Sequence, residues 1–124
     1  MNREISFKAW DYHLSKFVDF NLIGRVDFND PTYEFLQYTG LKDKNGEKIY
    51  SGDLINFTLQ GYAHGPESED IKKAEVFWDD KNACFSFGRY MTNEYMEYSF
   101  CLGDRIDRNS LEVVGNIFNN LNRG

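Results

Sequence analysis

Short apolar runs rich in aromatic and β-branched residues alternate with polar turn residues along the whole chain. In residues 4–10, Ile5, Phe7 and Ala9 alternate with Ser6 and Lys8, and this period of two is typical of a strand with one buried face. Phe, Tyr and Trp make up 17% of the sequence, and aromatic residues favour strands over helices. No long helical window interrupts these runs, so an architecture of alternating strands and helices is excluded.

The same pattern predicts further strands. They cover residues 16–20, 22–28, 33–38, 54–59, 74–78, 84–87, 94–102 and 111–116. Trp10 falls on the polar side of the first strand, and Gly24 marks a bulge or a close backbone approach in the third. Some neighbouring segments continue one another, so we count about seven or eight short strands. Their spacing is typical of a sandwich or a small barrel.

Turn residues separate these segments. Asp30-Pro31 makes a break, and Asn45-Gly46 accepts the positive φ angles of a tight turn after Lys42. Residues 79–83 read as a hairpin turn and residues 104–110 as a polar turn. Residues 60–70 are polar, carry two glycines and a proline, and predict a surface loop.

The predicted fold is mainly β: a small SH3-like or partly open β-barrel with an N-terminal β extension and little helix. The 124 residues contain no repeat, linker or low-complexity block, so we expect a single domain over residues 1–124. No segment approaches the roughly 20 apolar residues of a membrane-spanning helix. The first residues also lack the apolar run of a secretory signal, so we expect a cytosolic protein.

Charge constrains the partners. Lys and Arg number 14 against 20 Asp and Glu, a net charge of −6, which repels phosphate backbones and anionic membranes. Basic residues still cluster locally around two turns, at Lys42, Lys44 and Lys48 and at Arg105 and Arg108. Nucleic-acid binding through the first of these turns therefore stays an alternative.

Metal and cofactor chemistry find little support in the sequence. His13 and His64 lie in a predicted turn and the polar loop, and no Cys-x-x-Cys or His-x-x-x-His spacing is present. Cys84 and Cys101 lie in aromatic runs, where we expect two buried small hydrophobic residues rather than a disulfide. We expect no metal and no cofactor.

Catalytic motifs are absent too. The chain has no Gly-x-Ser-x-Gly elbow, no phosphate-binding loop and no Gly-x-Gly-x-x-Gly turn, so we expect no enzyme and no catalytic residue. The competing interpretation is a hydrolase or nucleotide-processing enzyme with a metal held by Asp53, Asp79 and Asp80. It requires these three carboxylates to converge in a concave site. The simpler reading makes Asp53 a structural acceptor of backbone N–H groups and Asp79-Asp80 ordinary turn residues.

Surplus aromatic residues favour an interface. Eleven Phe, eight Tyr and two Trp exceed what a core of this size easily encloses, and Tyr and Trp are enriched at interfaces. The alternative is a Phe-rich core with Tyr at its rim. The candidate partner-binding residues are Trp78 beside one turn and Tyr38 and Lys42 beside another. A protein partner or self-association as a homo-oligomer is the expected use.

Four segments of the chain read REISFKAWD at residues 3–11, QYTGLKDKNGEKIYSGDLI at 37–55, EVFWD at 75–79 and LEVVGNIF at 111–118. Together they resemble the YopX family of bacteriophage and prophage proteins. Residues 14–34 and 60–73 carry no family signal. The resemblance implies an accessory protein of phages and prophages that works in the cytoplasm of the bacterial host. It supplies no catalytic residues. Phage accessory proteins often contact host or phage macromolecules, and by analogy with that class the resemblance implies such an interaction.

Overall fold

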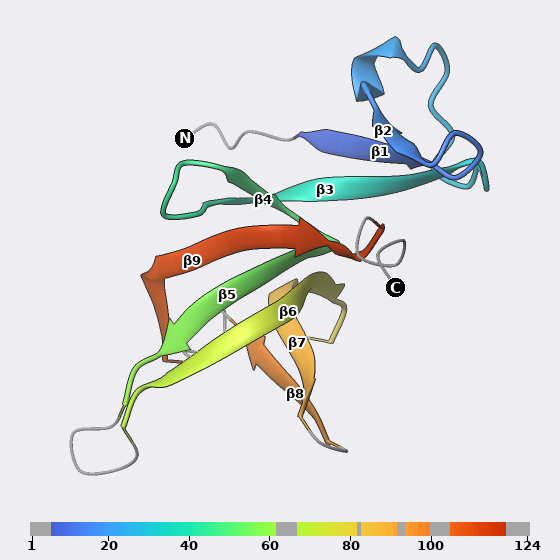
Figure 1. The fold of residues 1–124 in the computed structure, drawn as a ribbon. Helices are drawn as coiled ribbons and strands as arrows, with labels where there is room; N and C mark the ends of the chain where they lie inside the picture. The colour runs from blue at the N-terminus through green and yellow to red at the C-terminus, as the bar shows by residue number, and fades with distance from the viewer. Residues whose placement is uncertain (1–5, 62–66, 82, 92–93, 100–104, 119–124) are drawn as a thin grey trace.

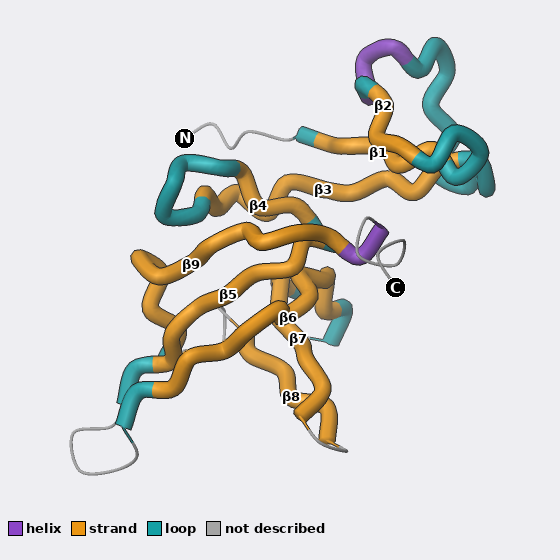
Figure 2. The backbone as a smooth tube through the Cα atoms, viewed as in Figure 1, coloured by secondary structure: helices purple, strands orange, loops and turns teal. Residues whose placement is uncertain are grey.

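The computed structural model describes residues 6–61, 67–81, 83–91, 94–99 and 105–118. Strands dominate this part of the chain, and helix is confined to short turns (Figures 1 and 2). The elements are β1 (Phe7–Asp11), β2 (Lys16–Val18), the 3-10 turn η1 (Phe20–Leu22), β3 (Tyr33–Lys42), β4 (Lys48–Tyr50), β5 (Asp53–Leu59), β6 (Glu69–Asp79), β7 (Cys84–Met91), β8 (Glu94–Ser99) and β9 (Ile106–Asn116). The mainly β prediction is confirmed.

The N-terminal strands form an antiparallel four-stranded sheet in the order β2-β1-β3-β4. Both faces of β1 are covered: Ala9 is fully buried, and Trp10 on the opposite face is 5% exposed. Trp10 stacks on Phe118, with ring centroids 5.0 Å apart. The assignment of Trp10 to a polar face was therefore wrong, because the C-terminal segment covers a side of β1 that local alternation marks as solvent-facing.

The remaining strands form a five-stranded antiparallel sheet in the order β8-β7-β6-β5-β9, which curls into a half-barrel below the first sheet (Figure 1). β5 alternates strictly between buried and half-buried residues, as expected for a strand with one face on the core. Its inward residues Ile55, Phe57 and Leu59 meet Val76, Phe87 and other buried residues of β6 to β9. This architecture agrees with the predicted partly open barrel with an N-terminal β extension.

The β3–β4 hairpin links the two sheets. Its turn contains Asn45-Gly46 as predicted, and Gly46 has a φ of 83°. Ile49 of β4 belongs to the half-barrel core, whereas Tyr50 joins Trp10, Tyr38 and Phe118 in a second core under the four-stranded sheet. One short strand therefore contributes to both cores.

The strand predicted over residues 22–28 is wrong. Residues 19–30 instead form the η1 turn and a loop, and Gly24 lies in a bend. Asp19, Asp27 and Asp30 each accept a bond from the backbone N–H two residues further on, at 2.9 Å. Such local side-chain bonds compete with strand pairing, and they outweigh the β propensity of the intervening apolar residues.

The polar turn predicted over residues 104–110 is also wrong in part. Its first residue lies outside the described residues, and β9 begins at Ile106. The pairing of β5 with β9 shifts between Asn56↔Glu112 and Thr58↔Asp107, so that β9 carries a bulge. Within the bulge, the Asn109 N–H donates to Asp107 Oδ1 and the Ser110 hydroxyl donates to the Asp107 carbonyl. The side-chain bonds typical of a turn are therefore present, but they lie in a bulge within a strand.

Other predicted elements have the expected type. The strand over residues 33–38 continues as β3 to Lys42, and residues 79–83 separate β6 from β7. Residues 62–66 of the loop predicted over residues 60–70 lie outside the described residues. Its end was placed too late, because Glu69 and Asp70 already pair with β5 as the start of β6. Among the residues described, no helical segment is both long and apolar enough to cross a bilayer.

Candidate functional site

Asp53 is the most deeply buried of the candidate acids, at 3% exposed. It begins β5 at the corner where the chain passes from the four-stranded sheet into the half-barrel. The Tyr50 N–H donates to Asp53 Oδ2 at 2.8 Å. Burial raises the pKa of Asp53 to about 6, although the bond from Tyr50 and the charge of Lys8 act in the opposite direction. This geometry agrees with a structural acceptor that holds the corner.

The three acids of the competing metal-enzyme interpretation do not converge. Asp79 ends β6 and its Oδ1 accepts from the Lys81 N–H at 3.0 Å, while Asp80 follows in the exposed turn. No group of three or more His, Cys, Asp or Glu side chains suited to a metal ion occurs in the described part of the chain. The convergence of Asp53, Asp79 and Asp80 that this interpretation requires is therefore not found.

The three predicted partner-binding residues lie in different environments. Tyr38 is 5% exposed and packs on Tyr50, whereas Lys42 is exposed at the end of β3. Trp78 lies on the other sheet, is 49% exposed, and meets Phe85 edge to face at 5.1 Å. The fold does not bring the three into one patch, and their role in binding stays a prediction.

The basic turn is partly engaged within the molecule. Lys44 Nζ lies 3.7 Å from Glu112 Oε1, and Lys48 Nζ lies over the Tyr38 ring at 5.2 Å. A phosphate would therefore compete with internal partners, which weakens the nucleic-acid alternative.

Cys84 and His13 belong to no group of metal-binding side chains among the described residues. Cys84 is buried at 5% exposure, as predicted, and its Sγ lies 3.2 Å from Ser99 Oγ. Cys101 and His64 lie outside the described residues. His13 occupies the predicted turn, where its backbone N–H donates to Asp11 Oδ1 at 2.8 Å.

The large exposed apolar side chains gather near the N-terminus. Eight of them are found among the described residues, and five lie between residues 12 and 28. All five come from the two segments that flank β2. We call the four aliphatic and Phe side chains among them the N-terminal apolar surface: Leu14 (54% exposed), Leu22 (82%), Val26 (37%) and Phe28 (60%). The excess of aromatic residues was the only sequence signal for exposed apolar area, and it did not point to these positions.

Aromatic packing supports this surface from below. Phe28 packs against Phe7 and Phe35 at centroid distances of 5.6 and 5.0 Å, and Phe20 packs against the same two rings. The loop over residues 19–30 is thereby seated on the outer face of β1 and β3. The backbone of this loop lies beside β2, on the part of the four-stranded sheet that is away from the half-barrel (Figure 2).

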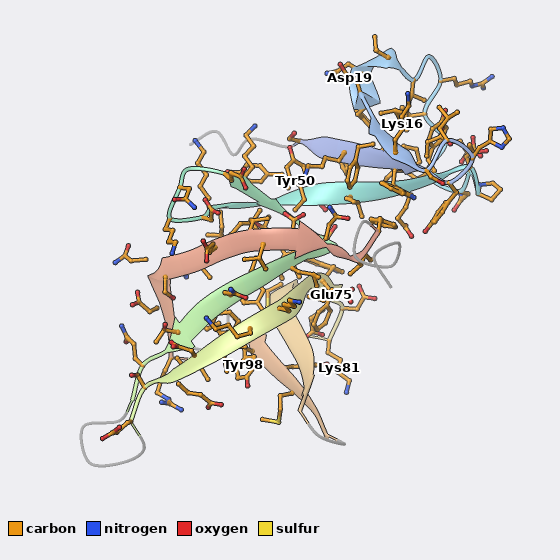
Figure 3. The ribbon with its side chains drawn as sticks, in the orientation of Figure 1. Lys16, Asp19, Tyr50, Glu75, Lys81 and Tyr98 are labelled. Atoms are coloured by element: carbon orange, nitrogen blue, oxygen red, sulfur yellow. The ribbon has the colours of Figure 1, made fainter. Side chains whose placement is uncertain are left out.

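A cavity of about 510 Å³ opens beneath this loop. Leu14, Val18, Leu22, Ile23 and Tyr33 supply most of its apolar wall, and the polar groups are Asp11, Asp19, Asp30 and Arg25. Lys16 and Asp19 lie at this end of the molecule, well separated from Glu75 and Lys81 of the half-barrel (Figure 3). This end of the molecule therefore combines exposed apolar side chains with a hollow lined by three aspartates and one arginine.

Comparison with known families decides the identity of the chain. The family model of the YopX protein matches residues 11–123. The chain belongs to the YopX family. The match includes three of the four segments that carry the sequence resemblance, and only residue 11 of the first. The N-terminal apolar surface lies within residues 14–34, the stretch of this YopX chain in which the sequence showed no family signal.

A solved structure shares this fold. The crystal structure of protein EF1440 from Enterococcus faecalis superposes with a TM-score of 0.56 at 22% sequence identity and covers 97% of both chains. No curated protein matches the chain. The YopX chain therefore shares its fold with this Enterococcus faecalis protein, and its activity has to be argued from its own surface.

Proposed function

We propose that this YopX protein is a noncatalytic interaction module, which binds a host or phage macromolecule in the cytoplasm of the bacterial host. The observation that carries the proposal is the N-terminal apolar surface, where Leu22 and Phe28 are 82% and 60% exposed. Several large apolar side chains exposed at one end of a molecule are typical of a protein-binding surface. Self-association through the same surface would also cover these apolar side chains.

The described acids support the noncatalytic part of the proposal. Asp11, Asp43 and Asp53 are buried, and each accepts backbone N–H bonds. A carboxylate engaged in this way holds the local backbone in place. The buried acids thus have structural partners, and the exposed feature without a structural explanation is apolar.

The test measures self-association of the protein and its capture of partner proteins. Sedimentation velocity on the intact protein, from low to high micromolar concentration, measures self-association. Affinity purification from infected or induced host cells identifies captured proteins. We expect Leu22→Ser with Phe28→Ser to remove the association that is found, and Trp78→Ser on the half-barrel to leave it unchanged.

The opposite pattern would contradict the proposal. Association that survives Leu22→Ser with Phe28→Ser, in a protein whose circular dichroism and melting temperature are unchanged, would show that the N-terminal apolar surface is not the interface. Loss of association in the Trp78→Ser control alone would move the interface to the half-barrel.

A further inference from the structure

Three carboxylates line the cavity beneath the N-terminal apolar surface, against one guanidinium. The acids are Asp11, Asp19 and Asp30, and the cation is Arg25. Asp27 lies between Val26 and Phe28 on the same loop. Apolar area and negative charge therefore occur together at this end of the molecule.

Backbone bonds hold these carboxylates in place. Asp11 Oδ1 accepts from the N–H groups of His13 and Leu14 at 2.8 and 3.0 Å. Asp19 and Asp30 Oδ1 accept from the N–H groups of Asn21 and Thr32, each at 2.9 Å. Acceptors fixed in advance lose little freedom when a partner binds, which favours affinity.

We propose that the N-terminal apolar surface binds a basic amphipathic protein segment, with a Lys or Arg side chain in the acid-lined cavity and apolar side chains on Leu22 and Phe28. This inference rests on the proposed function and names the chemistry of its partner. A long basic side chain suits the cavity because its methylene stem lies against the apolar wall of Leu14, Val18 and Ile23 while its charged end meets carboxylates. Opposite charge across the contact also speeds association and selects the partner.

The same charges disfavour other occupants. A second copy related by a twofold axis would bring an identical surface, and the acidic residues of the two copies would face one another. Nucleic acids and anionic membranes carry phosphates, which these carboxylates repel. Charge complementarity therefore selects a basic protein segment.

The test uses three labelled synthetic peptides of 16 residues and the intact protein. The first alternates Leu and Phe with Lys in an amphipathic pattern, the second replaces every Lys with Glu, and the third keeps the Lys and replaces the apolar residues with Ser. We expect the first peptide to bind at least about tenfold more tightly than the others by fluorescence anisotropy, a difference of about 1.4 kcal/mol. We expect amide shifts on binding to concentrate in residues 11–30.

Matched variants separate this contact from general attraction to an acidic protein. Asp19→Asn with Asp30→Asn keeps both side-chain acceptors and removes two charges at the cavity, and we expect binding to weaken at least about tenfold. Asp80→Asn with Asp107→Asn removes the same charge elsewhere and should change binding less than about twofold. Equal weakening by both pairs, or amide shifts outside residues 11–30, would overturn the inference.

Two further outcomes distinguish this inference from the proposed function. In the first, no peptide binds and Leu22→Ser with Phe28→Ser converts a dimer into monomers. The occupant is then a second copy of the chain, which overturns the inference and supports the proposed function. In the second, no peptide binds and the same substitutions abolish capture of a partner that has no basic segment. This result overturns the inference about a basic partner and leaves the proposed function supported.

Discussion

Two buried aspartates near the sheet junction have opposite pKa shifts. Burial opposes the charge of Asp43, but its carboxylate accepts N–H bonds from Val113, Glu47 and Asn45, and these together hold its pKa below the ordinary value. Asp53 has one such bond, from Tyr50, and burial raises its pKa to about 6. The direction of each shift therefore follows from the balance between burial, which raises the pKa, and backbone N–H donors and nearby positive charge, which lower it.

Asp53→Asn tests the raised pKa. The folded state holds the proton of Asp53 up to about pH 6, whereas the unfolded chain releases it near its ordinary pKa, so the stability from this group is present at low pH and lost as pH rises through 6. Asn keeps the acceptor for Tyr50 and carries no charge. We expect the stability of the variant relative to the natural protein to increase between pH 4 and 7, by up to about 3 kcal/mol.

Urea unfolding at several pH values measures this difference. Asp80→Asn in the exposed turn is the control, and its difference from the natural protein should vary little with pH. A difference for Asp53→Asn that stays constant from pH 4 to 7 would show that the carboxyl titrates normally in the folded state.

Asp43→Ala tests the other carboxylate. It removes the acceptor of three N–H groups, from the β3–β4 turn and from β9, and Asp43 is 7% exposed. We expect a loss of about 2 to 4 kcal/mol at pH 7, because partly buried donors lose their acceptor. In the natural protein, the contribution of this group is present above the ordinary pKa and is lost as pH falls through the lowered one.

Chemical denaturation of Asp43→Ala and Asp43→Asn gives the comparison. Asn retains one acceptor oxygen, so its loss should be smaller than that of Ala. Equal stability of Asp43→Ala and the natural protein would show that these three bonds contribute nothing net.

At the scale of elements, the corner between β4 and β5 depends on Gly52. Its φ is 87°, a region that disfavours side chains. Its N–H donates to the Val76 carbonyl, and its carbonyl accepts from the Ile117 N–H. The corner thereby joins the four-stranded sheet, the half-barrel and the C-terminal segment.

Gly52→Ala is therefore expected to destabilise the protein by about 1 to 2 kcal/mol. An added Cβ would lie 3.4 Å from Leu36 Cδ2, so backbone strain rather than a clash supplies the loss. Gly24→Ala is the control, because a Cβ there meets nothing within 4 Å and no positive φ is recorded. Thermal unfolding that ranks Gly24→Ala below Gly52→Ala would contradict this account.

Strand prediction succeeded where the local pattern and the pairing agree. The run 54–59 alternates in sequence and in burial as part of β5. It failed over residues 22–28, where aspartate side chains bind neighbouring N–H groups, and over residues 106–110, where a polar bulge pairs with β5. In both places the decisive bonds involve side chains and partners that a periodicity of apolar residues does not include.

At the scale of the whole molecule, Phe118 closes the second core. It is 6% exposed, stacks on Trp10 at 5.0 Å, and meets Phe17 and Tyr12 edge to face. Residues more than 100 positions apart along the chain are thereby packed together. This contact covers the face of the four-stranded sheet that joins the half-barrel.

Phe118→Ala should cost about 3 to 5 kcal/mol, the usual range for removing a buried aromatic ring. Urea unfolding measures the loss, and Trp10 fluorescence in a Trp78→Phe background reports the exposure of the second core. Leu22→Ala is the control, because its side chain is 82% exposed and should change stability by less than about 1 kcal/mol. A loss of that small size for Phe118→Ala would show that the C-terminal segment does not hold the sheets together.

Prediction of the site went less far than prediction of the fold. Composition indicated surplus aromatic residues, but Tyr38 is in the core, and the most exposed apolar side chain with described placement is Leu22, an aliphatic residue. Whether a side chain is buried depends on what covers it, and the covering segments come from distant parts of the chain.

By itself, the sequence determined the β class, the tight turn at Asn45-Gly46, the membership of the YopX family and the corner role of Asp53. These follow from local periodicity, from local turn chemistry and from the residues of four short segments that resemble the family. Only the tertiary structure decided that Trp10 is buried, that β9 contains a bulge, and that Leu22 and Phe28 stand exposed above an acid-lined cavity. The physical reason is that burial and charge environment are set by contacts between segments far apart in the chain.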